Sequence, residues 1–395
     1  MMAARIAARE TALGDLLGAD AGDLAGVAVA DLVLDSREIR PGAAFVAVQG
    51  GKTHGLAHAD EALRNGAALV LYDPRAAAPL GPWPAPPAHR AVAVPGLDGR
   101  LGELAQKLYA PRIGRIELAG VTGTNGKSTI AYLVAQAATR PESACGYIGT
   151  LGYGVPPALT PHALTTPDTF TLHRELAALG NARAALEVSS HALAQGRIAG
   201  LVFGTAAFTN LTRDHLDEHG DLERYGLAKA RLFERPGLRR AVLNVGDPFA
   251  AKLLERLPSG VEPIRIRVAD GAGADLEAEL EDRGLSGLVL HVKGRFGRAR
   301  LESRLIGDFN AENLLVALGV LLAWDMPLDD ACASLANAKA APGRLEVLGG
   351  GARRPTAVVD YAHTPDGLDR VLRVLDGVCG GELWCVFGCG GERDR

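Results

Sequence analysis

The feature that most constrains the fold is a short glycine-rich stretch, Gly123-Thr124-Asn125-Gly126-Lys127-Ser128-Thr129. It lies between an apolar, strand-like segment, RIELAGV, and a helix-like segment, STIAYLVAQAAT. Glycines let backbone N–H groups approach phosphate oxygens, and the helix that follows directs its positive end at them. A lysine here can neutralise β and γ phosphates, and a serine can hold magnesium. The order of strand, loop and helix therefore predicts a nucleotide-binding α/β domain.

This loop departs from the common pattern G-x-x-x-x-G-K-[ST], because Val121 occupies the position of the first glycine. The alternative interpretation is a glycine-rich turn with an exposed lysine. The strand before the loop and the helix after it favour phosphate binding.

The bulk composition excludes several classes of protein. The chain has 395 residues, of which 48% are apolar and 22% charged, so two or three folded domains are expected. A net charge of −4 argues against a dedicated nucleic-acid binder. The five cysteines show no zinc-ligand spacing and indicate reduced thiols. The first residues lack the apolar core of a signal peptide, and NLLVALGVLLAW is too short to span a bilayer. We expect a soluble, cytoplasmic enzyme, with that segment as a buried helix.

The pattern along the chain predicts an α/β protein with three domains, at residues 1–112, 113–342 and 343–395. The first alternates short apolar strands with helices, includes a proline-rich surface loop at 79–90, and ends at a linker at 111–115. The second repeats strand, loop and helix, as in a parallel sheet covered by helices.

The third segment starts as strand, loop and helix in TAVVDYAHTPDGLDRVLRVL. It continues in GELWCVFGCGGERDR as a second strand and a glycine turn. Such a unit is too small to fold alone, so we expect an incomplete, Rossmann-like third domain.

Two segments of the central domain place polar groups after apolar strands, where the sites of open α/β sheets lie. In EVSSHAL, Glu187 ends a strand; a carboxylate there either ligates metal or is otherwise paired, for instance with an arginine or as a helix cap. A serine hydrolase is not indicated, since no G-x-S-x-G surrounds the serines. In TNLTRDHLDEHGDLERY, the acidic and histidine side chains either bind a divalent ion or form a solvated loop.

Lys229 is the most informative single residue of the central domain. On a predicted helix at 221–234 it lies within an apolar stripe formed by Leu222, Tyr225, Leu232 and Phe233. Burial would lower its pKa and free the amine to react, for instance with carbon dioxide to give a metal-ligating carbamate. The alternative is a lysine that extends to the surface.

Together these segments resemble the Mur ligase family of peptidoglycan synthesis. The resemblance rests on LDSREIRPGAAFVAVQG, GVTGTNGKST, LTTPDT, EVSSHALAQGR, FTNLTRDHLDEHGDLERYGLAKARLF, GDFNAENLLVAL, GRLEV, VVDYAHTPDGL and LWCVFGCGGERDR, which span almost the whole chain. It implies an N-terminal UDP-binding α/β domain, a central P-loop ATPase-like domain with a parallel sheet, and a C-terminal amino-acid-binding domain.

The resemblance also implies roles for individual residues. Around ATP and magnesium these are Gly123, Thr124, Asn125, Gly126, Lys127, Ser128, Thr129, Glu187, His215, a carbamylated Lys229, Asn310, Asn313, Arg344 and Asp360. Among them, Ser128 and Glu187 would hold one magnesium ion, and His215 and Lys229 a second. For the uridine nucleotide, the muramoyl-dipeptide and the incoming amino acid they are Leu34, Ser36, Gly51, Lys52, Thr53, Thr165, Thr166, Ser189, Gln195, Arg197 and Arg393.

The implied reaction is an ATP-dependent ligation. The terminal carboxylate of UDP-N-acetylmuramoyl-L-alanyl-D-glutamate attacks the γ-phosphate, and the amine of an amino acid then displaces phosphate from the acyl phosphate. The motifs VVDYAHTPDGL and LWCVFGCGGERD are more similar to the type that adds meso-diaminopimelate than to the type that adds L-lysine. A D-N-P-R motif that reads the amino-acid side chain in the family does not occur in this chain. The chain is expected to act as a monomer without nucleic acid or membrane partners.

Three alternatives remain open at this point. The first is a different ligase of the same kind, either another Mur ligase or folylpolyglutamate synthase, of which the folate enzyme would lack the N-terminal uridine-nucleotide module. A P-loop kinase would need neither that module nor an inward lysine at 229. The third alternative is a non-catalytic fragment that binds ATP and a UDP-sugar, because the third domain is expected to be incomplete.

Overall fold

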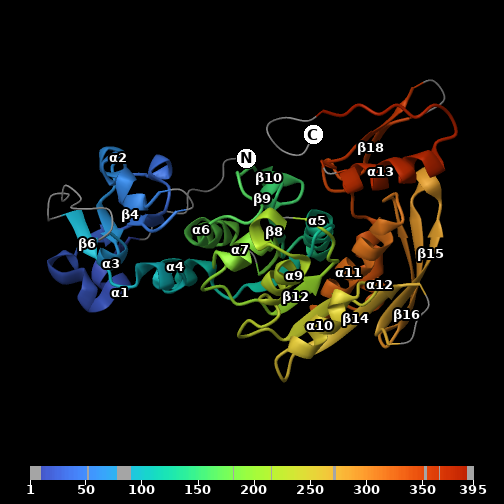
Figure 1. The fold of residues 1–395 in the computed structure, drawn as a ribbon. Helices are drawn as coiled ribbons and strands as arrows, with labels where there is room; N and C mark the ends of the chain where they lie inside the picture. The colour runs from blue at the N-terminus through green and yellow to red at the C-terminus, as the bar shows by residue number, and fades with distance from the viewer. Residues whose placement is uncertain are drawn as a thin grey trace. The chain divides into compact units, whose positions relative to one another are not determined.

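The computed structural model describes residues 10–50, 53–77, 90–180, 182–214, 216–269, 273–350, 354–363 and 365–388. They form two compact units (Figure 1). Unit 1 takes in the described residues of Met1–Ile116, Pro167–Asn181 and Gln195–Leu201, and unit 2 those of Glu117–Thr166, Ala182–Ala194 and Val202–Arg395. The division into three domains with the boundaries given above stays a prediction.

Unit 1 is built on a four-stranded parallel sheet. Its strands are β3 (Asp31–Val33), β4 (Ala43–Ala47), β5 (Leu69–Tyr72) and β6 (Ala91–Ala93), in that order. A small antiparallel pair, β1 (Thr11–Ala12) and β2 (Ala28–Val29), accompanies it. The helices are α1 (Leu13–Leu17), η1 (Gly18–Leu24), η2 (Ser36–Glu38), η3 (Gly55–His58), α2 (Ala59–Arg64), α3 (Pro74–Ala77), α4 (Leu97–Ile113) and α6 (Thr169–Leu179).

Both faces of this sheet are buried, which explains why its strands read as continuous apolar runs. Alternate strand residues belong to two separate cores: Leu32, Val46 and Leu71 to one, and Val33, Phe45 and Val70 to the other. The first core is completed by residues of α1, α4 and α6, and the second by residues of η3 and α2.

Unit 2 contains an eleven-stranded sheet, ordered β10-β9-β8-β11-β7-β12-β13-β14-β15-β16-β17. The pairs from β8 to β15 are parallel and those at both edges are antiparallel. The strands are β7 (Glu117–Thr122), β8 (Cys145–Gly149), β9 (Gly152–Val155), β10 (Ala158–Thr160), β11 (Arg183–Glu187), β12 (Thr205–Phe208), β13 (Arg240–Asn244), β14 (Glu262–Val268), β15 (Leu276–Asp282), β16 (Leu288–Gly294) and β17 (Gly297–Ser303).

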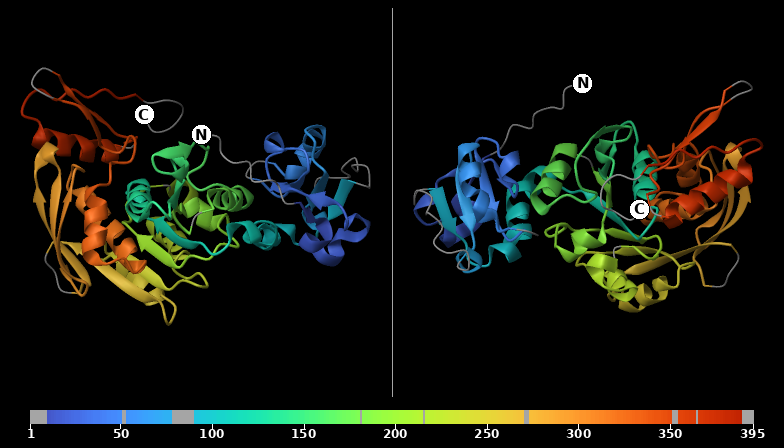
Figure 2. Two further views of the ribbon diagram at one scale, coloured as in Figure 1. Left: turned by 180° about the vertical axis from the view of Figure 1, so that it is seen from behind. Right: turned by 45° about the horizontal axis from the view of Figure 1, so that its top comes forward.

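The helices of unit 2 that matter most for the site are α5 (Lys127–Ala138) and α11 (Phe309–Ala323), which share one large core with strands of the sheet. Figure 2 gives two further views of the ribbon. The others are α7 (Ser190–Ala194), α8 (Leu216–His219), α9 (Leu222–Ala230), α10 (Phe249–Arg256), η6 (Gly284–Ser286), α12 (Leu328–Ala336) and α13 (Pro365–Val378). The predicted buried helix in NLLVALGVLLAW is confirmed as part of α11. Within the described ranges, no helix has both the length and the apolarity to cross a membrane.

The last part of unit 2 is an antiparallel hairpin, β18 (Glu346–Gly349) and β19 (Thr356–Val359), followed by α13. The predicted strand, loop and helix in 356–375 are confirmed, but the predicted strand in GELWCVFG is wrong. Residues 382–388 have no regular secondary structure, and Trp384 and Val386 are 83% and 98% exposed. A strand needs a paired neighbour and an apolar face to bury, and β19 is paired with β18 alone among the described strands.

Two local predictions need correction. The proposed linker at 111–115 begins inside α4, which continues through Pro111 to Ile113. Proline this close to a helix end removes only one backbone hydrogen bond, and the N–H of Gly114 still donates to the carbonyl of Ala110 at 3.1 Å. Leu222 was expected in the apolar stripe of the helix that carries Lys229, but as the first residue of α9 it is 39% exposed. The proline-rich loop at 79–90 lies, except for Arg90, outside the described residues.

Candidate active site

The glycine-rich loop connects β7 to α5 at the carboxyl end of the parallel strands. Gly123 and Gly126 have φ angles of +147° and +87°, which disfavour any residue with a side chain. A Cβ on Gly123 would lie 1.9 Å from Thr209 Oγ1, and one on Gly126 would lie 2.2 Å from Asn313 Oδ1. Both glycines are therefore required by backbone conformation and by space.

A second loop, residues 209–214 after the neighbouring strand β12, braces the glycine-rich loop. The N–H groups of Thr124 and Asn125 donate to the backbone and side-chain oxygens of Asn210, at 2.8 and 3.0 Å. In return, Thr209 Oγ1 donates to the carbonyl of Asn125 at 2.6 Å, and the N–H of Thr212 donates to Thr124 Oγ1 at 2.9 Å. The two loops thus hold one another in a fixed conformation; we call residues 209–214 the bracing loop.

Lys127 is half-buried at the start of α5, and its ammonium group bends back over the glycine-rich loop. It donates to the carbonyls of Gly123 and Thr124, at 3.0 and 2.8 Å. Burial lowers its pKa, while the nearby carboxylates of Glu187 and Asp214 oppose that shift. The ammonium group of Lys127 therefore lies close to the position that phosphates bound by the loop would occupy.

Glu187, at the end of β11, is 1% exposed, and its carboxylate is held by hydroxyl and amide donors. Tyr147 Oη donates to Oε1 at 2.6 Å, as does the N–H of Thr150 at 2.8 Å. Ser128 Oγ donates to Oε2 at 2.8 Å. Burial, aided by the negative charge of Glu187, raises the pKa of Tyr147, so Tyr147 stays a proton donor. Glu187 is therefore paired, with hydroxyl and amide donors in place of the arginine or helix cap considered above.

The Ser128–Glu187 pair fits a magnesium ion by the chemistry of its donors. A carboxylate and a hydroxyl oxygen lie side by side, next to a cationic loop. Magnesium is commonly bound by one or two protein oxygens together with waters and substrate phosphates. Among the described residues, no group of three or more histidine, cysteine, aspartate or glutamate side chains could hold a metal ion. His215, the ligand suggested for a second ion, lies outside the described residues.

Lys229 confirms the prediction of an inward lysine. It is 1% exposed, and its Nζ donates to the carbonyl of Gly123 at 2.8 Å. Its Nζ also lies 4.1 Å from the centroid of the Tyr225 ring. Burial lowers its pKa well below the ordinary value, and the positive charge of Lys127 adds to this effect. A lowered pKa increases the fraction of neutral, nucleophilic amine, which suits the side chain to covalent reaction.

The acidic and histidine cluster of residues 214–221 is engaged in local contacts. Asp221 caps α9 by accepting from the N–H of Arg224 at 2.7 Å. Glu218 forms a close ion pair with His191, and Ser190 Oγ lies 3.1 Å from His219 Nε2. Burial, with the nearby His191, lowers the pKa of His219. These contacts connect α8 to α7. They support neither of the two interpretations of the cluster, a divalent-ion site or a solvated loop.

Of the two asparagines that the resemblance assigns to the ATP site, one lies beside the loop and the other bonds to that residue. Asn313, buried on α11, faces Gly126, and its Nδ2 donates to Asn310 Oδ1 at 2.8 Å. Asn310 in turn donates to the carbonyl of Ile306 at 2.7 Å. Asn313 thus lies beside the loop, and Asn310 holds the Asn313 side chain in place through this hydrogen bond.

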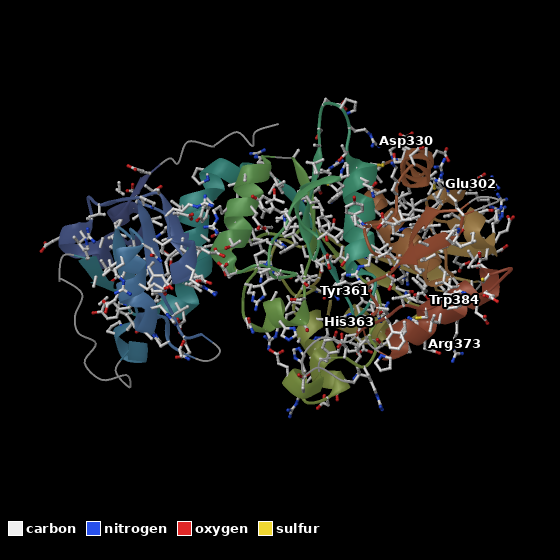
Figure 3. All side chains as sticks on the ribbon, turned by 90° about the horizontal axis from the view of Figure 1, so that it is seen from above. Glu302, Asp330, Tyr361, His363, Arg373 and Trp384 are labelled. Atoms are coloured by element: carbon white, nitrogen blue, oxygen red, sulfur yellow. The ribbon has the colours of Figure 1, made fainter. Side chains whose placement is uncertain are left out.

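Arg344, just before β18, and Asp360, just after β19, adjoin the same site. Arg344 donates to Ser128 Oγ at 3.2 Å, and its guanidinium carbon lies 4.6 Å from the centroid of the Tyr361 ring. Asp360 accepts from the N–H of Leu345 at 2.8 Å, which fixes the backbone beside Arg344. Tyr361 and His363 lie next to one another in Figure 3, with ring centroids 5.2 Å apart.

Three of the proposed dipeptide-contacting residues belong to unit 2 and adjoin Glu187. Thr166 Oγ1 donates to the backbone carbonyl of Glu187 at 2.7 Å and accepts from the N–H of Ser189 at 3.1 Å. Thr165 Oγ1 lies 3.1 Å from Thr150 Oγ1. Asp168, which belongs to unit 1, caps α6 through the N–H groups of Phe170 and Thr171.

The other proposed ligand contacts lie in unit 1 or outside the described residues. In unit 1, Ser36 Oγ donates to Glu61 Oε2 at 2.5 Å, Thr53 Oγ1 lies 3.5 Å from His58 Nε2, and Arg197 donates to Gln195 Oε1 at 2.6 Å. Leu34 packs partly buried against the core of α1 and α4. Gly51, Lys52 and Arg393 lie outside the described residues.

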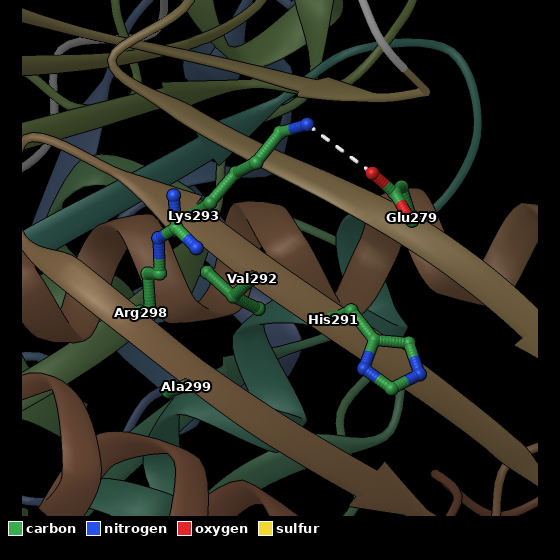
Figure 4. A pocket seen from close by; sticks show the side chains of 6 residues that line it. All are labelled: Glu279, His291, Val292, Lys293, Arg298 and Ala299. Atoms are coloured by element: carbon green, nitrogen blue, oxygen red, sulfur yellow. Dashed lines mark hydrogen bonds and ion pairs between the residues drawn. The ribbon is translucent and has the colours of Figure 1, made fainter.

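A separate hollow of about 420 Å³ lies on the antiparallel end of the sheet, on β15, β16 and β17 (Figure 4). It is lined by Glu279, His291, Val292, Lys293, Arg298 and Ala299. Lys293 Nζ donates to Glu279 Oε1 at 3.2 Å across it. None of the residues proposed for nucleotide or substrate contacts lines this hollow.

Comparison with family models assigns the chain. A model described as the Mur ligase middle domain matches residues 121–321, which include the glycine-rich loop, Glu187 and Lys229. A model of the glutamate ligase domain of Mur ligases matches residues 343–395, and one of the Mur ligase family catalytic domain matches residues 29–109.

The chain belongs to the Mur ligase family. Two curated relatives from Xylella fastidiosa (strain Temecula1) and Xanthomonas campestris (strain 8004) are 44% and 46% identical to this Mur ligase. Both are named UDP-N-acetylmuramoyl-L-alanyl-D-glutamate--2,6-diaminopimelate ligase. Each comparison covers 93% of this chain and 74% of the relative.

Solved structures agree with the fold of this Mur ligase. One of a UDP-N-acetylmuramoyl-L-alanyl-D-glutamate--2,6-diaminopimelate ligase has a TM-score of 0.77 and 33% identity, and covers 98% of this chain and 78% of its own. The MurF ligase of Thermotoga maritima, solved with ADP, has a TM-score of 0.61 at 20% identity, with coverages of 87% and 74%. Folylpolyglutamate synthetase from Lactobacillus casei, at 18% identity, has a TM-score of 0.53 and covers 71% of this chain and 76% of its own. The last two likenesses concern the fold alone.

Sequence reasoning missed several residues that shape the site of this Mur ligase. Thr209, Asn210 and Thr212 brace the glycine-rich loop, and Tyr147 and Thr150 hold Glu187. A signal for the first three was present, because TNLT directly follows an apolar strand. The local sequence does not reveal the order of strands in the sheet, which places β12 beside β7.

Proposed function

We propose that this Mur ligase joins meso-diaminopimelate to UDP-N-acetylmuramoyl-L-alanyl-D-glutamate at the expense of ATP. The observation that carries the proposal is the buried Ser128–Glu187 hydrogen bond of 2.8 Å at the phosphate-loop helix. It occurs in a chain whose relatives, at 44% and 46% identity, are named for that reaction. The same relatives support meso-diaminopimelate over the alternative amine, L-lysine.

The reaction has two steps. An oxygen of the substrate carboxylate forms a bond to the γ-phosphorus of ATP, and the bond to the β–γ bridging oxygen breaks, which gives an acyl phosphate and ADP. The amine of the amino acid then attacks the acyl carbon, loses a proton, and expels inorganic phosphate to leave the amide.

The main obstacle is repulsion between the carboxylate and the triphosphate. Lys127 offsets this repulsion with a cation held over the loop, and backbone N–H groups at the first turn of α5 would face the phosphate oxygens. Magnesium, when bound by Ser128 and Glu187, would supply further positive charge to the transferring phosphate. Arg344, which donates to Ser128 Oγ at 3.2 Å, would add a second protein cation.

Lys229 is proposed to act as a carbamate. Its neutral amine would attack the carbon of carbon dioxide, forming an N–C bond and releasing one proton. The product is a carboxylate at the place of a neutral amine, next to Gly123, whose carbonyl accepts from Nζ at 2.8 Å. The new negative charge would suit a second magnesium ion together with His215.

The remaining proposals follow the family resemblance. Leu34, Ser36 and the region of Thr53 would contact the uridine nucleotide, and Thr165, Thr166, Ser189, Gln195 and Arg197 the muramoyl-dipeptide. Arg393 would contact the amino acid. We also propose that the enzyme acts in the cytoplasm as a monomer.

Mass spectrometry of the reaction products tests the proposal. The chain is incubated with ATP, magnesium and the UDP-dipeptide, with meso-diaminopimelate and L-lysine offered together. A UDP-tripeptide that carries diaminopimelate is the expected product. A lysine-containing tripeptide would correct the amine. A stable phosphorylated substrate would indicate a kinase instead, and nucleotide binding without any product would indicate a non-catalytic binding fragment.

A further inference from the structure

A set of contacts outside the proposed ligand-binding residues connects two loops of the site. Helix α7 follows shortly after Glu187, the last residue of β11, and α8 follows the bracing loop. His191 and Ser190 of α7 contact Glu218 and His219 of α8. The ring centroids of His191 and His219 lie 5.7 Å apart, in an edge-to-face arrangement.

Two side-chain bridges, one an ion pair and the other a hydrogen bond, join α7 to α8 and differ in their exposure to solvent. The ion pair between His191 and Glu218 is partly exposed, with side-chain exposures of 25% and 46%. The bridge between Ser190 Oγ and His219 Nε2, at 3.1 Å, involves a serine that is 2% exposed. A short helix such as α8 has little stability of its own, so its place depends on these contacts.

The contacts continue from α8 to α9. The ring centroids of His219 and Tyr225 lie 5.2 Å apart, and Lys229 Nζ lies 4.1 Å from the centroid of the same Tyr225 ring. Lys229 Nζ donates to the carbonyl of Gly123 at 2.8 Å. A continuous series of contacts between described residues thus leads from α7 through α8 and α9 to the glycine-rich loop.

We propose that His191 and His219 are positioning residues, which with Glu218 and Ser190 clamp α8 onto α7 and so hold the bracing loop in the conformation that MgATP requires. The reason is geometric: Thr209, Asn210 and Thr212 of that loop fix Thr124 and Asn125, and the loop ends shortly before α8. Release of α8 frees one end of the loop and allows the glycine-rich loop to relax. The inference rests on the proposed function only for the identity of the nucleotide.

A double-mutant cycle tests the clamp. The variants are His191→Gln, Glu218→Gln and both together, with MgATP affinity measured by calorimetry and KM and kcat measured in the ligation assay. We expect each single change to weaken MgATP binding by about threefold to tenfold, and the double change to add little, because both remove one bridge. The KM for the amino acid should stay unchanged.

The matched control is the ion pair between Lys252 and Glu223, which joins α10 to α9 at 2.7 Å with side chains 52% and 66% exposed. Lys252→Gln and Glu223→Gln should leave MgATP binding unchanged. A purely structural role for the clamp would lower the melting temperature and the amount of active enzyme without a change in MgATP affinity, and this result would overturn the inference. So would independent, additive effects of the two changes on MgATP affinity, or equal effects in the control pair.

A fallback variant and a comparison with the ligation assay keep the outcome of the test decisive. Should a variant of the ion pair fail to fold, His219→Gln removes the bridge to Ser190 and the ring contacts with His191 and Tyr225 but leaves the ion pair, and the same loss of MgATP affinity is expected. If the wild-type chain binds MgATP but forms no tripeptide, the proposed reaction fails and the binding cycle still tests the clamp. If it forms tripeptide while the cycle is additive, the clamp alone fails.

Discussion

The Nζ of Lys229 lies 2.8 Å from the carbonyl oxygen of Gly123, so a buried amine on α9 holds the first glycine of the phosphate loop. This contact connects the nucleotide site to a buried lysine whose pKa is lowered well below its ordinary value. It also means that chemistry at Lys229 acts directly on the loop.

Replacement of Lys229 by methionine should stabilise the fold and abolish ligation. A buried lysine with a lowered pKa binds fewer protons in the folded state than in the unfolded state, so it costs stability at neutral pH. That cost is absent above the unfolded pKa, near 10.5, and grows as the pH falls below it toward the lowered, folded pKa. We therefore expect Lys229→Met to raise the melting temperature at neutral pH, by an amount that shrinks as the pH approaches that value.

Thermal unfolding between neutral and alkaline pH measures this effect. The control is Lys252→Met, at an exposed position, where the change in melting temperature should be small at every pH. A destabilised Lys229→Met protein at neutral pH would contradict the account of the buried amine.

Glu187→Gln should leave the fold intact and remove magnesium-dependent activity. Glutamine keeps an oxygen for the donors Tyr147 and Thr150 but removes the negative charge that a divalent ion needs. We expect the rate of ligation to fall by about a hundredfold or more, on the scale seen when one electrostatic group of a site is lost. Steady-state kinetics over a range of magnesium concentrations checks this, and Glu302→Gln on the exposed face of β17 (Figure 3) serves as the control. Unchanged magnesium dependence in Glu187→Gln would exclude the assignment.

Gly126→Ala should cost more stability and nucleotide affinity than Gly180→Ala. Both glycines have positive φ angles, +87° and +59°, so both substitutions carry the left-handed strain of about 1–2 kcal/mol. Only at Gly126 would the new Cβ also meet a buried side chain, 2.2 Å from Asn313 Oδ1, since nothing lies within 4 Å at Gly180. Denaturant unfolding and ATP titration compare the two variants. Equal losses of stability would show that the contact with Asn313 does not matter.

Tyr109→Phe should lower the stability of unit 1 without touching the nucleotide site. Tyr109 is 1% exposed and its hydroxyl donates to Asp31, which also accepts from Arg174 at 2.8 Å. Loss of a buried hydrogen bond to a charged acceptor costs about 1.5–3 kcal/mol. Denaturant unfolding measures the loss, and Tyr153→Phe, at a half-buried position, is the control. An unchanged midpoint would contradict the role of the hydroxyl.

Much of the site could be predicted from local sequence, because its parts follow apolar strands in a recognisable order. The loop from Gly123 to Ser128, the carboxylate of Glu187 and the inward Lys229 were each predicted from their own neighbourhood. The partners that hold them were not, since Tyr147 reaches Glu187 and Thr209 reaches Asn125 only through the order of strands in the sheet. The clamp between His191 and Glu218 depends in the same way on tertiary packing.

The errors have a related cause. Leu222 fits the helical period but lies at the first turn of α9, where the core no longer covers it. Pro111 suggested a linker, but a proline near the end of α4 is tolerated. Residues 382–388 have the composition of a strand, and composition cannot supply the neighbouring strand that a strand requires.

The central claim is that ATP activates a carboxylate, and its most direct test follows oxygen atoms. The UDP-dipeptide is prepared with a heavy oxygen isotope in its terminal carboxylate, and the inorganic phosphate released during ligation is analysed by mass spectrometry. An acyl phosphate transfers one labelled oxygen to each phosphate, which is the result that the account predicts. Phosphate without label, formed alongside tripeptide, would contradict it.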